Sequence, residues 1–339
     1  MKRFVISGET DFPRCFEKPK MIVIDATDPT KPFLAAEMER NSTAVSFAVF
    51  DSSLFCSAKG ALEIYELSAL PMLKTVSVLE GTVGGCTLIV DRSGKHLFLS
   101  AWDKGFDVVD FSDPTKPLHI SSCGCEYHSD YDEWSDRSGV KPYGIAQMEK
   151  HGNFLIAVAM DYNIRKHREA LYVYDVHKPE RPEIFARIST APIRTHAMAV
   201  SGDYAYAGGY EKILSININH PEEPEIVGEI ELKGVCANYF FSREDRLYVS
   251  GRLLSSPDGD CFIGVIDVSN PVHPKLIGGT ALPTVAGYEI TLREDIAYIA
   301  CAGGLGIVRV RNPERPELLS VFPITRPGVE FWGIEVFHL

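Results

Sequence analysis

Four side chains at comparable points along the chain have the chemistry needed to move protons: Tyr143, His196, Tyr288 and Glu289. Phenol, imidazole and carboxyl groups act as general acids and bases when a fold brings them within hydrogen-bonding reach of a substrate. A hydrolase, a lyase or an isomerase could use His196 with a nearby carboxylate or tyrosine. A single histidine is also commonly a structural hydrogen-bonding residue, so the catalytic interpretation competes with a structural one.

A second group of side chains could hold a ligand without reacting with it. Small-molecule sites combine aromatic walls with a few convergent polar groups. The candidates of this kind are Arg194, Trp332, Asn238, Trp102, Asp103, Asp161 and Arg252. The competing interpretation is that the aromatic residues only pack between structural units.

The sequence predicts neither a metal nor a cofactor. Cys123, Cys125 and His128 form a CxCxxH pattern, but the paired spacing and the fourth ligand of a structural zinc site are missing. The acidic segment 130–139 lacks the glycine that an EF-hand loop requires. GxSxG, P-loop, GxGxxG and HExxH motifs are absent from the chain.

A repeat must position these side chains. Seven segments share an apolar run, an acidic position and a proline pair, as in MIVIDATDPTKP and FDVVDFSDPTKP. The acidic position falls at residues 25, 66, 110, 175, 217, 267 and 309, although Asn217 and Arg309 replace the acid. Each unit holds four short runs rich in Val, Ile, Tyr and Phe, which predicts four strands. Asp or Asn before proline favours a turn, so the proline pair predicts a corner between the third and fourth strands.

These repeats resemble the LVIVD-repeat family of β-propellers. The resemblance covers nearly the whole chain and implies an all-β fold: a seven-bladed β-propeller of four-stranded antiparallel blades in a single domain, residues 1–339. The ends RFVIS (3–7) and FWGIEVF (331–337) match blade strands, so we expect both termini to close the ring. We expect the last blade to take two strands from each end. The family implies a propeller but no particular activity.

The extra residues of the longer units gather on one face of the predicted ring. The gap between residues 110 and 175 is enlarged in segments 123–142 and 160–169, and the gap between 217 and 267 in segment 252–261. By antiparallel alternation, all three insertions lie opposite the proline corners. Insertions in repeat proteins often map to the binding face, although drift in exposed loops is the alternative. The inner strands open on this face at Val45, Cys86, Tyr143, His196, Ala237, Tyr288 and Trp332.

Composition excludes some partners. The formal net charge of −12 argues against binding to nucleic acid or to an anionic membrane. The apolar stretch near the N-terminus is too short for a signal peptide, and the eight cysteines are scattered rather than framework-like. These features predict a cytoplasmic protein with reduced thiols and no structural disulfide.

Two functions remain open at this point. The first is a module that binds a small molecule or a protein at the insertion-bearing face, over the mouth of the central channel. The second is an enzyme with its active site in the same mouth, under a lid formed by residues 123–142. The sequence does not identify the reaction, the ligand or the oligomeric state.

Overall fold

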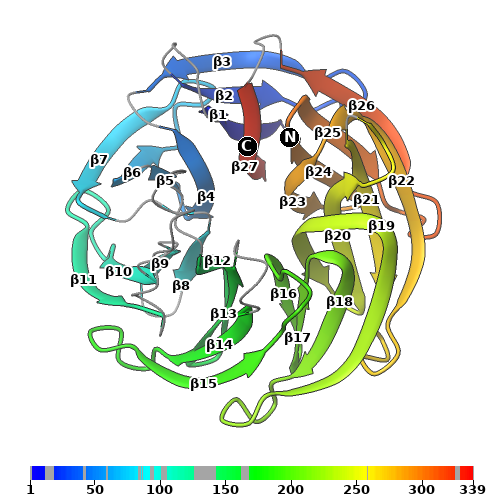
Figure 1. Cartoon of the computed structure of the whole chain (residues 1–339). Helices are drawn as coiled ribbons and strands as arrows, with labels where there is room; N and C mark the ends of the chain where they lie inside the picture. The colour runs from blue at the N-terminus through cyan, green and yellow to red at the C-terminus, as the bar shows by residue number, and fades with distance from the viewer. Residues whose placement is uncertain are drawn as a thin grey trace, which may run out of the picture.

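The computed structural model is a ring of twisted antiparallel sheets around a central channel (Figure 1). It describes residues 2–11, 19–40, 43–58, 60–82, 85, 87–91, 95–100, 105–125, 143–161, 168–257, 259–324 and 329–338. The β-propeller fold and the four-stranded blades predicted from the sequence are therefore confirmed.

Five of the sheets have four strands each, ordered from the channel outward. The first contains β27 (Val329–His338), β1 (Arg3–Asp11), β2 (Lys20–Asp25) and β3 (Phe33–Glu39). The second contains β4 (Ala44–Phe50), β5 (Ser53–Ala58), β6 (Ala61–Glu66) and β7 (Lys74–Glu80). The third contains β8 (Leu88–Asp91), β9 (His96–Ser100), β10 (Phe106–Asp110) and β11 (Leu118–Cys123). The fourth contains β12 (Tyr143–His151), β13 (Phe154–Asp161), β14 (Ala170–Asp175) and β15 (Glu183–Ser189). The last in chain order contains β23 (Gly287–Arg293), β24 (Ile296–Cys301), β25 (Gly304–Arg309) and β26 (Glu317–Pro323).

The remaining sheet has seven strands, because one long strand serves twice. Its strands are β16 (Ala197–Ser201), β17 (Tyr204–Gly208), β18 (Tyr210–Asn217), β19 (Glu225–Arg243), β20 (Arg246–Leu253), β21 (Asp260–Asp267) and β22 (Lys275–Val285). The first half of β19 pairs with β18 as an outer strand, and its second half pairs with β20 as an inner strand. The described residues therefore form six hydrogen-bonded sheets rather than seven separate ones.

Both termini contribute to one sheet, as expected, but in a different proportion. Strand β27 pairs with β1 from Arg3↔His338 to Asp11↔Val329, and β1 pairs with β2. The prediction of two strands from each end was wrong, because β26 pairs with β25 and completes the preceding blade. The closing sheet takes one strand from the C-terminus and three from the N-terminus.

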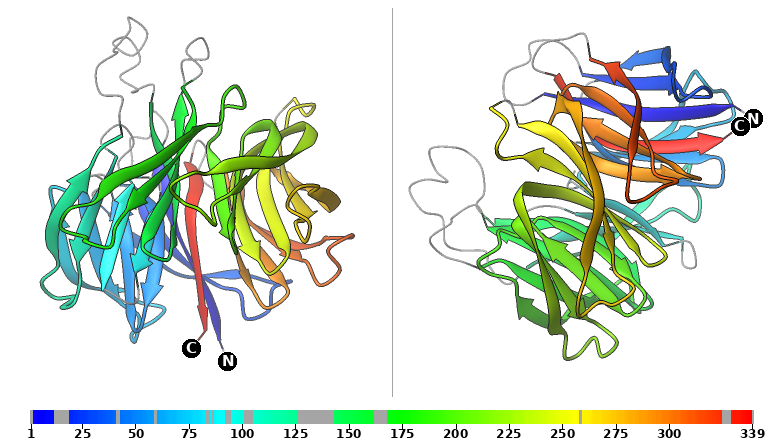
Figure 2. Two further views of the ribbon diagram at one scale, coloured as in Figure 1. Left: turned by 90° about the horizontal axis from the view of Figure 1, so that it is seen from below. Right: turned by 90° about the vertical axis from the view of Figure 1, so that its right-hand side faces the viewer.

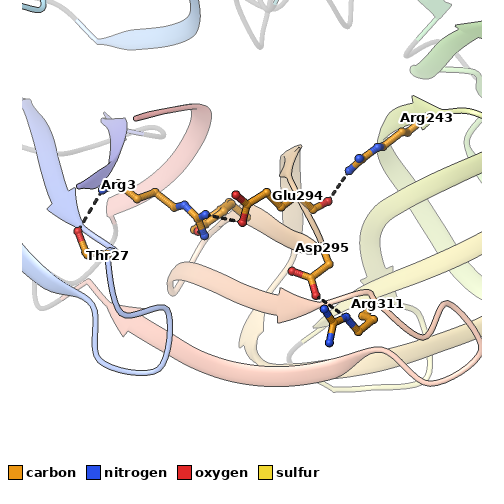
Figure 3. A network of polar contacts seen from close by, with 7 residues as sticks. Arg3, Thr27, Arg243, Glu294, Asp295 and Arg311 are labelled. Carbon is orange, nitrogen blue, oxygen red and sulfur yellow. Dashed lines mark hydrogen bonds and ion pairs between the residues drawn. The ribbon is translucent and has the colours of Figure 1, made fainter. Parts of the chain in front are cut away.

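A polar network on the proline-corner face supports this closure (Figure 3). The Arg3 guanidinium lies 2.9 Å from the Glu294 carboxylate and donates to the Tyr298 hydroxyl at 3.0 Å. Arg243 donates to the backbone carbonyl of Glu294. The N-terminal strand is thereby attached to the β23–β24 turn, and that turn to the β19–β20 turn. The two chain ends lie side by side at this face (Figure 2).

The repeated acid has a local structural role. The Asp25 carboxylate accepts a hydrogen bond from the backbone N–H of Thr27. In three other repeats the aspartate accepts the same bond from the residue two positions later: Asp110 from Ser112, Asp175 from His177 and Asp267 from Ser269. An Asx turn of this kind starts the corner that proline then continues. The predicted corner between the third and fourth strands is confirmed.

The core lies between neighbouring blades. Strand β24 is buried over its whole length, since both of its faces meet other sheets. A cluster between the fourth and the seven-stranded sheets joins Ile156, Leu171, Met198 and Ile216.

In the described part of the chain all six cysteines are free thiols. No helix that could cross a membrane occurs among the described residues.

Candidate functional site

The inner strands open at one level around the channel, as the alignment predicted. In five of the seven cases the predicted opening residue belongs to, or lies next to, a pair formed near the end of the second strand: Ala44↔Ala58, Tyr143↔Asp161, Ala197↔Gly208, Ala237↔Gly251 and Gly287↔Cys301. Tyr143 is the first residue of β12, but its side chain lies outside the described residues, as do Cys86, Trp102 and Asp103. His196, Tyr288 and Trp332 are described and partly exposed.

One group at this level is built around the Tyr210 ring, at the start of β18. The Arg194 guanidinium carbon lies 5.1 Å from the centre of this ring, which is cation–π distance. Arg252 donates from Nη2 to the Tyr210 hydroxyl at 2.9 Å. The His196 ring meets the same tyrosine edge-on, with 6.5 Å between ring centres. The structure thus brings three of the predicted residues, Arg194, His196 and Arg252, together around Tyr210.

The backbone holds Arg194 in an unusual conformation. Its φ is 50°, in the left-handed region that costs energy for residues other than glycine. Gly209 packs directly beneath it, since a Cβ there would lie 2.2 Å from the Arg194 carbonyl oxygen. The neighbouring backbone is tied down by a hydrogen bond from Tyr210 N–H to the Ile193 carbonyl. Strained residues of this kind persist where the surroundings fix them, which is frequent at functional sites.

His196 is held between two hydrogen-bonding partners. Its Nδ1 lies 2.8 Å from the Arg194 carbonyl oxygen, and its Nε2 lies 3.2 Å from Asn238 Oδ1 and 3.9 Å from the Cys236 sulfur. Burial lowers the pKa of His196, against the hydrogen bonds that raise it. A neutral imidazole carries one N–H, which it can donate either from Nδ1 to the Arg194 carbonyl or from Nε2 to Asn238 Oδ1, since both partners are acceptors. The geometry therefore gives His196 a positioning role beside Arg194.

A second group joins Tyr288 and Trp332 through one carboxylate. Glu330 accepts the Tyr288 hydroxyl at 2.8 Å and the Trp332 indole N–H at 2.7 Å. The two rings lie 5.6 Å apart and tilted by 41°. Burial, then the Glu330 charge and hydrogen bond, raises the pKa of Tyr288, so this hydroxyl stays protonated.

Several polar side chains of the inner strands instead link one inner strand to the next. Adjacent inner strands belong mostly to different sheets, so side chains satisfy their channel-facing backbone groups. The bonds run from Leu88 N–H to Ser46 Oγ at 3.2 Å, Met198 N–H to Gln147 Oε1 at 2.7 Å, Val200 N–H to Glu149 Oε2 at 2.8 Å, Asn238 Nδ2 to the Gly287 carbonyl at 2.8 Å, and Ile334 N–H to Glu289 Oε2 at 3.1 Å. We call this set the inner-strand belt.

The belt contains two carboxyl groups with raised pKa values. Burial raises the pKa of Glu149 to about 7, although the Val200 N–H lowers it. Burial raises the pKa of Glu289 to about 8, with a smaller contribution from the Glu335 charge. Glu289 also accepts the Tyr239 hydroxyl at 3.2 Å. Both predicted candidates in the belt, Asn238 and Glu289, therefore use polar atoms for contacts between strands.

Asp161 is also part of an ion pair. It is buried at the end of β13 and lies 2.7 Å from the Arg168 Nε. The CxCxxH pattern falls partly outside the described residues, since His128 is not among them, while Cys123 and Cys125 are. Among the described residues, no group of three or more His, Cys, Asp or Glu side chains could hold a metal ion.

A hollow of about 520 Å³ adjoins the Tyr210 group on its outer side. It is open to solvent and is lined by Pro192, Ile193, Tyr210, Glu211, Lys212, Glu231 and Lys233. The hollow adjoins the loop that carries Arg194.

Gln147 and Glu149 were not selected as functional residues from the sequence. Their signal in the sequence is that two polar residues interrupt the apolar alternation of YGIAQMEKH.

Comparison with known proteins confirms the family resemblance. The LVIVD repeat model matches residues 84–124, 258–280 and 288–322. Together with the propeller architecture, these matches are consistent with an LVIVD-repeat β-propeller. No curated protein matches the chain.

Solved structures share the fold over almost the whole chain. A hypothetical selenium-binding protein from Sulfolobus tokodaii has a TM-score of 0.72 at 12% identity, covering 98% of this chain and 93% of that one. Apo AztD from Citrobacter koseri has a TM-score of 0.62 at 13% identity, covering 99% and 98%. Sqt1 from Chaetomium thermophilum, bound to the N-terminus of ribosomal protein L10, has a TM-score of 0.60 at 14% identity, covering 96% and 89%. At these identities the likeness shows the fold alone.

Proposed function

We propose that this chain is a ligand-binding β-propeller whose site is the channel mouth on the insertion-bearing face. Seven blades form the ring in this proposal, since the two halves of β19 serve two blades, and residues 1–339 act as one domain. The observation that carries the proposal is the convergence of charged and aromatic groups at the mouth. Arg194, Arg252 and Tyr210 form one side, and Tyr288 with Trp332 forms the other.

Membership of the inner-strand belt distinguishes the candidates that hold the ring together from the candidates that could contact a ligand. Asn238 and Glu289 hold neighbouring inner strands, and Asp161 holds Arg168. The Tyr288–Trp332 pair and the two arginines satisfy no backbone group of a neighbouring inner strand through the contacts described above. Aromatic faces with a few convergent polar groups are what a small-molecule site requires. Protein partners at a propeller face are the alternative occupant, as in the Sqt1 complex.

A screen for ligands tests this function. Small metabolites are tested for a rise in melting temperature, and each hit is measured by calorimetry against Trp332→Ala. The control is Phe33→Ala, which removes an aromatic ring that is 57% exposed on an outer strand. We expect weaker binding to the first variant and unchanged binding to the second. Binding that depends on Phe33 and not on Trp332 would place the ligand elsewhere.

The catalytic alternative depends on His196. Both of its ring nitrogens already have protein partners, which favours a positioning role over that of a general base. His196→Ala should weaken ligand binding while the fold stays intact, because the residue supports the Arg194 loop. Turnover of a bound ligand that disappears in this variant, with binding retained, would favour an enzyme.

A further inference from the structure

We infer that the ligand carries a carboxylate or phosphate group, held by the guanidinium groups of Arg194, which lies over the Tyr210 ring, and Arg252, which contacts the Tyr210 hydroxyl. This inference rests on the proposed function, because it assigns the chemistry of the ligand at the same site.

Among the described residues, these two guanidinium groups have no carboxylate partner. Several half-buried or buried arginines elsewhere in the described part form ion pairs, although the half-buried Arg246 does not: Arg3 pairs with Glu294, Arg168 with Asp161, and Arg293 with Glu335. Within the same described part, no ion pair includes Arg194 or Arg252. The chain has 46 acidic residues against 34 basic ones, so carboxylates are plentiful. Two partly buried cations left unpaired in an acidic protein leave a place for an anion from outside.

Both positive charges act on the same group, the Cys236 thiol. Burial raises the pKa of the Cys236 thiol, while the charges of Arg252 and Arg194 oppose that rise. The Arg252 charge also works against the rise in the pKa of Tyr288 and contributes to the lowered pKa of His196. Glu330 accepts from Tyr288, and Glu211 accepts the Gly234 N–H at 2.6 Å. The positive charges of Arg194 and Arg252 thus both act on the groups around Tyr210.

The two guanidinium groups are also positioned to bind an anion. Arg252 uses one N–H on the Tyr210 hydroxyl and has further donors on the same planar fork. Arg194 is stacked against the same ring, on a loop fixed by its left-handed backbone and by Gly209. A guanidinium fork matches the oxygens of a carboxylate or a phosphate, with two parallel hydrogen bonds. The nearby rings of Tyr288 and Trp332 suit a planar or apolar body attached to that anion.

Calorimetry with matched probes tests the inference. Benzoate and benzamide have nearly the same shape and differ in charge, and inorganic phosphate provides a second anion; ionic strength is kept constant with NaCl. We expect wild-type protein to bind benzoate or phosphate at millimolar concentration and to bind benzamide much more weakly. The comparison of benzoate with phosphate distinguishes the two sources of the anionic group.

Three variants locate the binding. Arg194→Gln and Arg252→Gln should each weaken anion binding about ten-fold or more, since a hydrogen bond to a charged group is lost. Arg181→Gln is the control, because this exposed arginine pairs with Glu183 at a proline corner on the opposite face. Tyr210→Phe keeps the ring and removes the hydroxyl that orients Arg252, so it should weaken binding less. Circular dichroism melts confirm that each variant is folded.

The outcomes separate this inference from the function on which it rests. Equal binding of benzoate and benzamide, no heat from either anion, or unchanged binding by both arginine variants would each overturn the anionic ligand. A neutral ligand lost in Trp332→Ala but retained in Arg194→Gln would leave the site in place with a different chemistry. Binding that no variant at the mouth alters would overturn both proposals.

Discussion

Replacing Glu289 with glutamine should remove a large part of the pH dependence of folding stability near neutrality. Glu289 lies in the inner-strand belt, where its carboxyl group contacts the Ile334 N–H and the Tyr239 hydroxyl. Burial raises its pKa from 4.5 to about 8. Glutamine has the same shape as the protonated acid and keeps a carbonyl acceptor, but it cannot ionise.

The sign follows from proton binding in the two states. Between the ordinary pKa and about 8, the unfolded chain loses the proton that the folded protein keeps, so stability falls as pH rises. Each pH unit in this window costs about 1.4 kcal/mol, so the decrease from pH 5.5 to pH 7.5 is about 2.5 kcal/mol. Glu289→Gln should therefore match wild type near pH 5 and exceed its stability by about 3 kcal/mol at pH 7.5.

Urea unfolding across this pH range measures the effect, with the free energy extrapolated at each pH. Glu149→Gln is the matched control, because burial raises the pKa of Glu149 only to about 7. The control should remove only the contribution of Glu149 to the slope below pH 7 and leave the decrease between pH 7 and pH 8, which Glu289 causes. If Glu289→Gln followed the wild-type curve throughout, the folded protein would hold Glu289 as a carboxylate and the argument from burial would fail.

Three further predictions concern the ring, the corners and the thiols. Deleting residues 329–339 should lower the free energy of unfolding by roughly 5 kcal/mol or more. Phe331, Ile334 and Val336 are each only 1% exposed, and burial of each such side chain contributes about 1.5–3 kcal/mol. Thermal melts measure this effect, and an unchanged melting temperature would contradict closure of the ring by β27. Asp267→Ala should cost at most about 1 kcal/mol by removing the Asx turn to Ser269. The bonds to Ser269 lower the pKa of Asp267, so this contribution is present above the ordinary pKa of 3.8 and disappears as pH falls below it, and wild type and variant should converge in acid. Denatured protein prepared without oxidant should titrate with eight free thiols, matching its eight cysteines, and a lower count would mean that a disulfide had formed.

The fold could be predicted from the sequence because its signals are local and repeated. Each proline corner is specified within a few residues, as in the hydrogen bond that the Asp25 carboxylate accepts from the Thr27 N–H. Seven copies of the repeat indicate the same structural unit. The level of the inner-strand openings was also predictable, since it follows from strand alternation. The distribution of strands between the two ends was not, because LLSVF has the pattern of any outer strand and only its pairing with β25 assigns it.

The roles of individual polar residues could not be predicted, because their partners lie one blade away. Glu149 reaches Val200, and Asn238 reaches Gly287, across about fifty residues of sequence. Nothing in the local pattern distinguishes Glu289, which completes such a link, from Arg194, which has no ion pair among the described residues. Both are charged residues near the start of an inner strand.

These two kinds of polar residue differ in whether the side chain hydrogen-bonds a backbone group of the next inner strand. A buried backbone N–H without a partner is costly, so a side chain that satisfies one in the next inner strand is required by the ring itself. Replacing such a residue should reduce stability whether or not a ligand binds. Arg194 and Arg252 meet no such requirement through the contacts described, and Arg194 holds a strained backbone besides. Arg194 and Arg252 contact the ring and the hydroxyl of Tyr210, but neither has a carboxylate partner among the described residues. That is why the anionic ligand is assigned to them and not to the belt.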